Sequence, residues 1–223
     1  MIFTITFVTY IYLIKEEQKL LNLKYTQHTK HTGIFIKNLI EDKKNATLIM
    51  AIALSKNEKV KEFIDTKNYD VINYNDITDE LKENTDYKNV WIQIIDLNGN
   101  SLYRSWTDIK SDLKFRKDLN ETLIEKKIST SISVGRFDMT IKGRSPIYKN
   151  NHVIGFIEVI THFNSISEKL KSQSIDSIVI TDKKYKNTIK FPYSNIFIND
   201  YYIANKNVKS ELVRIYKLIL KNV

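Results

Sequence analysis

A predicted β-hairpin over residues 91–106 constrains the fold of this chain more than any other segment. Its sequence, WIQIIDLNGNSLYRSW, has two runs rich in β-branched and aromatic residues on either side of Asn98 and Gly99. Asn-Gly is the preferred pair for a turn that needs positive φ, and such flanking residues favour strands. We interpret Asp96 as a residue that serves the turn. The hairpin predicts an antiparallel sheet whose second strand carries an arginine and aromatic side chains to a surface.

The segment before the hairpin is typical of helix. Residues 15–67 contain no proline, and Gly33 is their only glycine. Apolar residues recur there at irregular helical spacing, and the apolar stripe widens from Ile34 onward. We predict one long helix or two stacked ones, packed on a sheet after Ile34. A helix of about fifty residues would be roughly 75 Å long, which suits a mechanical connector. Within residues 65–86 we predict a short helix near residues 77–81, bounded by loops.

The first fourteen residues, MIFTITFVTYIYLI, are apolar and uncharged, and Lys15 begins a charged segment. As a helix they would rise roughly 21 Å, which is less than the roughly 30 Å of a bilayer's hydrocarbon core. They lack the positively charged start and the small-residue cleavage site of a signal peptide. We therefore expect the outer part of a signal anchor that begins before this sequence, with a buried helix or strand as the alternative.

The remaining segments predict one antiparallel sheet covered by helices. We expect a helix over residues 111–127, strands over 129–134, 137–147 and 152–161, and a helix over 163–172 capped by Asn164 or Ser165. This order is that of an α+β fold. A smaller unit follows from Ser177, with strands predicted at 178–182 and 195–204 and a helix at 210–220. It has too few strands to close a sheet of its own.

Composition argues against several classes of function. The net charge is +9, but the lysines are spread along the chain and no nucleic-acid-binding motif occurs, so we expect no nucleic-acid partner. The chain has no cysteine, which excludes disulfides and thiolate metal sites. His28 and His31 have a permissible metal spacing but no acidic partner within a turn, so we expect neither a metal nor a cofactor. Because no nucleophile elbow, phosphate loop or HExxH motif occurs, and His162 suits a capping or core role, we expect no enzyme activity.

The order of the elements resembles the double Cache family of extracytoplasmic sensor domains, which occur in bacterial chemoreceptors, sensor histidine kinases and cyclic-di-GMP enzymes. Residues 91–106, 133–135, 143–148 and 153–170 carry the resemblance. It implies a long amino-terminal helix, a PAS-like antiparallel sheet with flanking helices, and a partial second module. The implied parts are a partial transmembrane anchor (1–14), a connecting helix (15–67), a membrane-distal module (68–172) and an incomplete membrane-proximal module (173–223). The resemblance also implies a sensor at the inner membrane that faces the periplasm and forms a homodimer through the long helix.

In that family a small molecule binds between the sheet and the loops over it, and two residues after the hairpin turn suit that role. Arg104 and Trp106 would share a face if the strand persists that far. A guanidinium suits a carboxylate, and tryptophan offers an apolar wall or a cation-binding face. This pair directly follows the hairpin, whereas amino-acid-binding members of the family have Arg-x-Trp in a later loop. We therefore expect a small anionic or zwitterionic ligand. The further candidate residues are Tyr103, Arg116, Asp138, Arg144, Tyr148 and Glu158.

Two alternatives stand beside this interpretation. The arginines could form surface ion pairs with Asp108, Asp112 or Asp118, and Trp106 and Tyr148 could be packing residues. The chain could also be a membrane-anchored scaffolding protein whose long helix mediates self-association and whose pocket is vestigial. In the sensory hypothesis, ligand binding would instead bias two packings of the sheet against the long helix.

Overall fold

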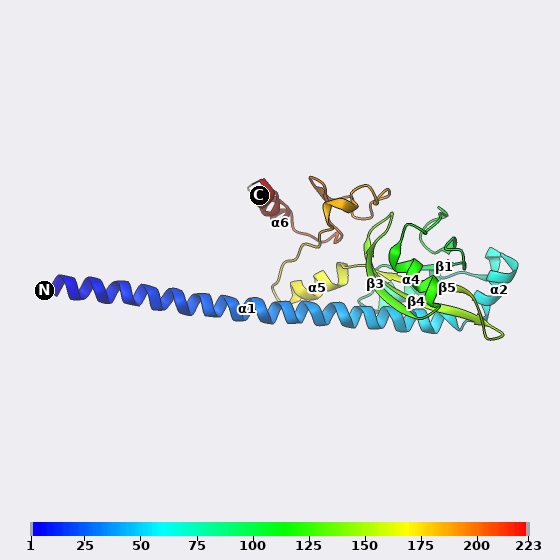
Figure 1. The fold of residues 1–223 in the computed structure, drawn as a ribbon, viewed down its shortest axis with the longest axis horizontal. Helices are drawn as coiled ribbons and strands as arrows, with labels where there is room; N and C mark the ends of the chain where they lie inside the picture. Colours follow the sequence, from blue (N-terminus) through cyan, green and yellow to red (C-terminus); the bar gives the residue numbers. More distant parts are fainter. Residues whose placement is uncertain (1, 222–223) are drawn as a thin grey trace. The chain divides into compact units, whose positions relative to one another are not determined.

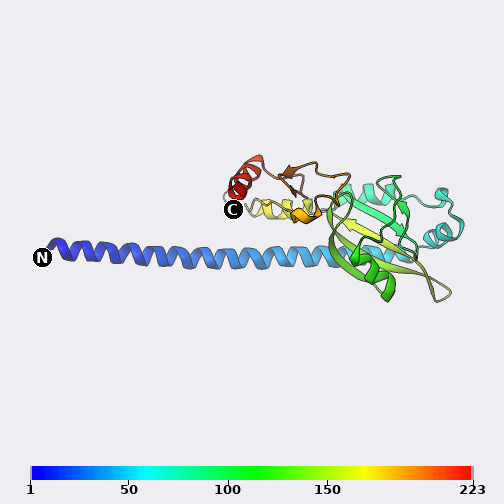
Figure 2. The same cartoon turned by 45° about the horizontal axis from the view of Figure 1, so that its top comes forward.

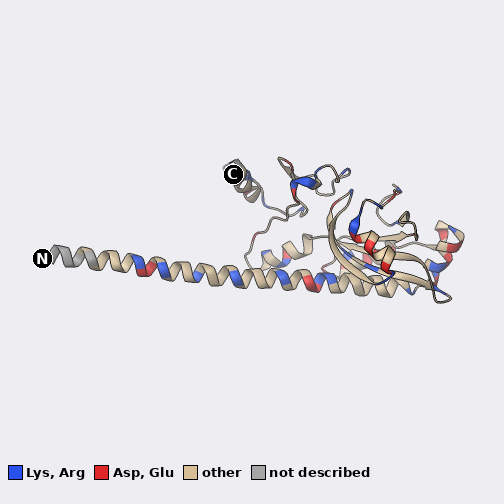
Figure 3. Ribbon diagram, in the orientation of Figure 1, with Lys and Arg blue, Asp and Glu red and all other residues tan. Residues whose placement is uncertain are grey.

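A computed structural model describes residues 2–221 of the chain, which divides into two compact units after Ile40. The first unit is the amino-terminal part of helix α1 (Ile2–Ser55). The second unit starts at Glu41 and contains the sheet, and it is the unit that carries the site. Lys and Arg are distributed over its helices, strands and loops (Figure 3), as the sequence indicates.

The second unit is built on a five-stranded antiparallel sheet (Figure 1). Its strands are β1 (Val90–Ile95), β2 (Ser101–Arg104), β3 (Ser129–Val134), β4 (Met139–Lys149) and β5 (His152–Thr161), in the order β2-β1-β5-β4-β3. The predicted hairpin is present as β1 and β2, with Gly99 at a φ of 79° and Asp96 accepting from the amides of Asn98 and Asn100. The predicted α+β class is confirmed.

Helices cover one face of this sheet with an apolar layer. The part of α1 after Ile40 and helix α2 (Glu58–Thr66) supply Ala51, Val60 and Phe63, which pack against Ile92 and Val159. The helix approaches β4 closely, because the strand has a glycine, Gly143, where it passes the helix backbone. Figure 2 shows the same elements after a turn of 45°.

The opposite face of the sheet is polar although it is buried. Side chains alternate between the two faces of a strand, and on β1, β4 and β5 the residues of this second face include Gln93, Lys142, Arg144 and Glu158, each less than 4% exposed. Helix α4 (Lys117–Glu125) and the loop of residues 105–116 lie on this side. The polar face is therefore the part of the fold where a ligand-binding site is expected.

Several predicted element bounds need correction. Of the two alternatives predicted for residues 15–67, one long helix or two, the chain forms two: α1 ends at Ser55, and Asn57 caps α2 by accepting from the Lys59 amide. Helix α3 (Asn75–Asn84) is longer than predicted, and the 3-10 turn η1 (Tyr69–Val71) was not expected. Helix α4 starts at Lys117 instead of 111, because Asp112 accepts from the Lys114 amide and holds a turn there.

Neither Asn164 nor Ser165 caps helix α5 (Asn164–Ser172), contrary to the prediction. Tertiary contacts take both side chains. Asn164 Oδ1 accepts from the Lys206 amide at 2.8 Å, and Ser165 Oγ accepts from Lys43 Nζ at 2.7 Å. The cap position is Phe163, which makes no side-chain capping bond.

The segment after residue 172 has little regular structure. The strand predicted at 178–182 is a single bridge between Ile180 and Ile203, followed by the 3-10 turn η2 (Lys183–Tyr185). The region 195–204 holds a short hairpin of β6 (Phe197–Ile198) and β7 (Tyr201–Tyr202), and helix α6 (Ser210–Lys221) follows. Between η2 and β6 the chain passes along the β3–β4 turn, because the amides of Lys190 and Phe191 donate to the Arg136 carbonyl and that of Tyr193 to the Phe137 carbonyl.

None of the helices formed by residues 2–221 is long and apolar enough to cross a membrane. The first fourteen residues are apolar, and from Ile2 they form the start of α1. Met1 lies outside the described residues, and the partial anchor over 1–14 stays a prediction.

Candidate ligand-binding site

The polar face of the sheet borders a small cavity under the loop of residues 105–116. Its lining residues are Trp91, Gln93, Arg104, Trp106, Leu113, Phe115, Arg116, Gly135, Arg136, Phe137, Asp138, Thr140, Lys142 and Ile160. They come from four strands, the loop after β2, and the β3–β4 turn. The volume is about 40 Å³, far below the roughly 300–1,000 Å³ of typical small-molecule pockets. A ligand of several carbon atoms therefore enters only if part of the lining moves.

Aromatic rings form one wall of the cavity. Trp91 and Trp106 are stacked with ring centroids 4.7 Å apart and planes 9° apart, and Phe137 meets both edge-on at 6.1 and 5.9 Å. This offset and edge-to-face packing is the favourable geometry for aromatic groups. The indole Nε1 of Trp106 is buried and has no hydrogen-bond partner within residues 2–221. The wall is apolar and carries one unused donor.

Three cationic side chains line the cavity without an ion-pair partner among the described residues. Arg104 is 8% exposed and donates to the Ile109 carbonyl and, at 2.9 Å, to Ser111 Oγ. Burial lowers the pKa of Arg104 to about 10, so its guanidinium stays charged at neutral pH. Lys142 Nζ donates to the backbone oxygen and to Oγ of Ser133, at 2.7 and 2.9 Å. The third cation is Arg136, whose guanidinium lies 5.4 Å from the Phe115 ring centre.

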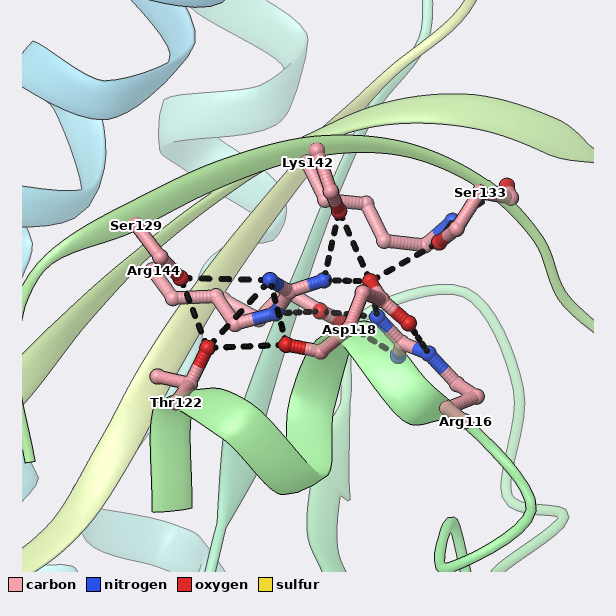
Figure 4. Close-up of polar contacts among 9 residues, drawn as sticks. Arg116, Asp118, Thr122, Ser129, Ser133, Lys142 and Arg144 are labelled. Carbon is pink, nitrogen blue, oxygen red and sulfur yellow. Dashed lines mark hydrogen bonds and ion pairs between the residues drawn. The ribbon is translucent and has the colours of Figure 1, made fainter. Parts of the chain in front are cut away.

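A buried charge network lies behind these cations (Figure 4). Glu158 accepts from Arg116 Nη1 and Nη2 at 2.9 and 2.6 Å and from Arg144 Nε at 2.7 Å. Asp118 pairs with both arginines and accepts from the hydroxyls of Ser131 and Ser133. Burial disfavours the ionised form of Glu158, but the charges of Arg116 and Arg144 outweigh it and lower the pKa to about 2. The same balance holds the pKa of Asp118 well below its usual range.

Asp138 is the carboxylate that lines the cavity directly, and both of its oxygens already hold donors. Oδ1 accepts from the Met139 amide at 2.7 Å, and Oδ2 lies 2.8 Å from Nδ1 of His162. Burial lowers the pKa of His162, so the neutral ring donates from Nδ1 to Asp138. The same ring contacts Trp91 and Tyr193, with centroids at 4.3 and 4.5 Å. The interpretation of His162 as a core histidine is confirmed, since it is 3% exposed.

The structure brings four of the eight predicted site residues to the cavity: Arg104, Trp106, Arg116 and Asp138. Arg144 and Glu158 lie behind it in the charge network. Tyr103 alternates with Arg104 along β2 and therefore faces the helix side, where its ring meets Phe63 and Tyr74. Tyr148 is at the exposed end of β4, 42% accessible and near Lys56. Neither tyrosine lines the cavity.

The alternative of surface ion pairs holds in part. Arg116 and Arg144 do pair with Asp118, but both arginines are buried, and Arg104, also buried, has no ion pair among the described residues. The lining residues that sequence reasoning missed include Trp91, Gln93, Phe137 and Lys142. Strand alternation is the signal that could have found two of them. Gln93 pairs with Arg104 across the hairpin and Lys142 is two residues before Arg144, so each shares a sheet face with a predicted site residue. Choosing them required the register of β4 against β5, which no short-range pattern supplies.

Burial of Lys142 predicts that stability rises with pH above neutrality. Burial, aided by the charge of Arg116, lowers the Lys142 pKa from 10.5 to about 7. Between these values the unfolded chain holds a proton that the folded chain has lost, so the free energy of unfolding increases with pH. We expect Lys142→Met to remove a slope of up to about 1 kcal/mol per pH unit. Urea unfolding from pH 7 to 9.5 measures it.

Lys149→Met, at the exposed end of the same strand, is the matched control and should keep the wild-type slope. Lys43, whose pKa burial also lowers to about 7, contributes equally to both proteins. An unchanged slope in Lys142→Met would contradict the prediction.

The chain belongs to the double Cache family. The model of the double sensory domain of two-component sensor kinases matches residues 24–218. No curated protein sequence matches the chain. Among solved structures, a domain of a sensory box/GGDEF family protein from Vibrio parahaemolyticus is similar, with 12% identity, a TM-score of 0.51, and coverage of 69% of this chain and 67% of the other. That likeness concerns the fold.

Two further structures show weaker similarity. The sensor domain of the Vibrio cholerae histidine kinase DctB has 16% identity and a TM-score of 0.43, over 66% of this chain and 62% of that one. The ligand-binding domain of the Campylobacter jejuni chemoreceptor Tlp3, solved in complex with L-valine, has 17% identity and a TM-score of 0.39, over 82% of this chain and 75% of that one. The family assignment makes this chain a sensory domain, without a catalytic domain in its matched residues.

Proposed function

We propose that the chain is the ligand-binding part of a membrane signalling receptor, exposed outside the cytoplasm, and that its cavity recognises a small anionic or zwitterionic molecule. The observation that carries the ligand class is the set of unpaired cations, Arg104, Arg136 and Lys142, beside an aromatic wall. Arg104 is the member of this set that is both buried and fully charged at neutral pH, since Arg136 is half-buried and burial lowers the Lys142 pKa to about 7. A buried charge without a counterion is unfavourable. A ligand carboxylate would supply the missing charge, and a guanidinium can hold it with two hydrogen bonds.

Ligand entry would involve the loop of residues 105–116. This loop closes the cavity through Arg104, whose guanidinium binds the Ile109 carbonyl and the Ser111 hydroxyl. A ligand carboxylate competes for the same donors. Binding can shift the loop only to the extent that the ligand prefers the opened arrangement. The proposal therefore includes an outward movement of this loop when the ligand binds.

The parts of the receptor follow from the same proposal. We propose an anchor over residues 1–14, a connector over 15–67, a distal module over 68–172 and a partial proximal module over 173–223, with the sensor on the periplasmic side of an inner membrane. Exposed apolar side chains on α1, among them Leu20, Leu23 and Ile49 at 56 to 66% exposure, support a homodimer formed through this helix. The family description favours a sensor kinase as the output.

The first test of this function is a ligand screen combined with a substitution of Arg104. The full chain is screened by thermal unfolding against small carboxylates and amino acids, since ligand at one hundred times its dissociation constant adds about 2.7 kcal/mol. We expect Arg104→Ala to weaken binding of an anionic ligand by roughly 10- to 100-fold, because hydrogen bonds to charged groups contribute about 1.5–3 kcal/mol. Titration calorimetry measures the change.

Arg214→Ala, an exposed arginine on α6, is the control and should bind as the wild type does. Full retention of affinity in Arg104→Ala would remove Arg104 from the site. A folded chain that no compound in the panel stabilises would favour the scaffolding alternative.

A further inference from the structure

We infer that the ligand of this cavity is a small organic carboxylate that carries no ammonium group. This inference rests on the proposed function and narrows it from anionic or zwitterionic to anionic alone. It follows from an imbalance in the lining: hydrogen-bond donors and positive charges are in excess, and every carboxylate near the cavity already has donors on it.

Unused donors are present on several lining residues. Arg104 has five N–H groups; the loop takes two of them, and Nε donates to the Gln93 side-chain oxygen at 3.3 Å, which leaves two. Trp106 Nε1 is buried without an acceptor among residues 2–221. Arg136 makes no side-chain hydrogen bond or ion pair within the described chain, although its guanidinium borders the cavity beside Phe115. A group that only accepts hydrogen bonds, such as a carboxylate, would satisfy these donors together.

Every carboxylate near the cavity is already occupied. Glu158 lies between Arg116 and Arg144, and Asp118 pairs with the same two arginines. Asp138, which lines the cavity, has the Met139 amide on one oxygen and His162 on the other. A ligand ammonium would have to share the Asp138 oxygens with the donors already on them, and displacing an arginine from Glu158 or Asp118 would leave a buried charge unpaired.

Three of the lining aromatic rings, Trp106, Phe137 and Phe115, already have a guanidinium near them. An ammonium can bind over the face of a tryptophan or phenylalanine. Here the Arg104 guanidinium already lies 5.6 Å from the Trp106 ring centre and 5.7 Å from that of Phe137, and Arg136 lies over Phe115. The described charges around the cavity are five cationic residues and three carboxylates. The balance stays positive even when Lys142 is neutral, so a ligand ammonium would be repelled.

The rest of the lining favours an organic acid over an inorganic anion. Trp91, Leu113, Phe137 and Ile160 present carbon to the cavity. Hydrocarbon that moves from water to such a surface is stabilised in proportion to its area, and phosphate or sulfate has none. Short-chain monocarboxylates therefore match both the donors and the walls.

Three compounds with a related skeleton test the inference on the full chain. Isovalerate and L-valine differ by the α-ammonium group, and isobutylamine is valine without its carboxylate. We expect calorimetry at pH 7 to detect isovalerate, to give L-valine at least about tenfold weaker affinity, and to give no signal with isobutylamine. Succinate against L-aspartate, and propionate against L-alanine, repeat the comparison for other chain lengths. Sulfate and phosphate are expected to give no stabilisation.

The outcomes separate this inference from the proposed function. Tighter binding of any amino acid than of its matched acid, or binding of isobutylamine, would overturn the inference and leave the proposed function standing. Binding of sulfate or phosphate, without binding of any organic acid, would overturn the inference that the ligand is organic. If neither acids nor amino acids bind to the folded chain, the proposed function fails and the inference with it.

One variant and one control test the donors. Trp106→Phe keeps an aromatic ring and removes the Nε1 donor, so affinity for the acid should fall about tenfold. Arg214→Ala, an exposed arginine on α6, should keep the wild-type affinity for the acid. Unchanged acid binding in Trp106→Phe would contradict the donor-excess argument.

Discussion

Glu158→Gln is expected to lower the free energy of unfolding by about 3–5 kcal/mol, the usual cost of removing one partner from a buried ion pair. Glu158 is fully buried and accepts three hydrogen bonds from Arg116 and Arg144. Without its charge, two buried guanidiniums would share the single carboxylate of Asp118. Because whole domains are stable by only about 5–15 kcal/mol, urea unfolding at pH 7 should resolve the loss easily.

Glu41→Gln is the matched control. Glu41 is exposed on α1 and pairs with Lys44 at 3.0 Å, and such surface pairs contribute about 0–1 kcal/mol. The double variant Glu158→Gln with Arg144→Gln restores the charge balance, since Arg116 and Asp118 remain as a neutral pair. We expect it to be more stable than the sum of the single effects by about 1–3 kcal/mol. A loss below about 1 kcal/mol in Glu158→Gln would contradict the network's role.

The stability that Glu158 contributes is expected to decrease as the pH falls. The folded-state pKa of Glu158, about 2, lies below its ordinary value of 4.5. Its stabilisation is therefore fully present above pH 4.5 and is lost as the pH falls toward 2. Glu158→Gln should lose less stability than the wild type over that interval. Asp118 pairs with the same two arginines, so its own contribution also changes in the variant, and the difference between the two proteins reports on the coupled network.

The sequence predicted the sheet well because its signals are local. Asn98-Gly99 and the alternating runs around it define the hairpin, and β3, β4 and β5 lie within two residues of their predicted bounds. Helix ends were less predictable. Asn164 and Ser165 have the chemistry of caps, but Lys206 and Lys43 hold their side chains instead, and a contact with a residue so distant in sequence leaves no local pattern.

Half of the predicted site residues line the cavity, and the rest of the site depends on contacts between residues that are distant in sequence. Residue type suggested Arg104 and Trp106, and strand alternation could have separated Tyr103 from Arg104. The buried ion network could not be anticipated, because Arg116, Arg144 and Glu158 meet only through the pairing of β4 with β5 and the position of the loop before α4. Lys142 was overlooked since a lysine on a strand is usually solvated.

Gly143→Ala is expected to lower the free energy of unfolding by about 2–3 kcal/mol, in the range measured for overpacked cores. A Cβ at this position would lie 2.7 Å from the Thr47 carbonyl oxygen and from the Leu48 amide nitrogen. Both are backbone atoms of α1, so no side-chain rotation can relieve the contact. The helix and β4 would have to separate, which would also strain the 2.8 Å hydrogen bond between the Thr47 and Thr161 hydroxyls.

Gly33→Ala is the control, because nothing lies within 4 Å of the added Cβ and alanine is the better helix former by about 1 kcal/mol. It should not lower stability. Gly143→Ala also reports on signalling, since its neighbours Lys142 and Arg144 face the cavity and the ion network while Gly143 touches α1. If ligand binding shifts β4 against the helix, separating them should change both ligand affinity and receptor output. Wild-type stability and affinity in Gly143→Ala would show that the two faces of β4 are not coupled through this contact.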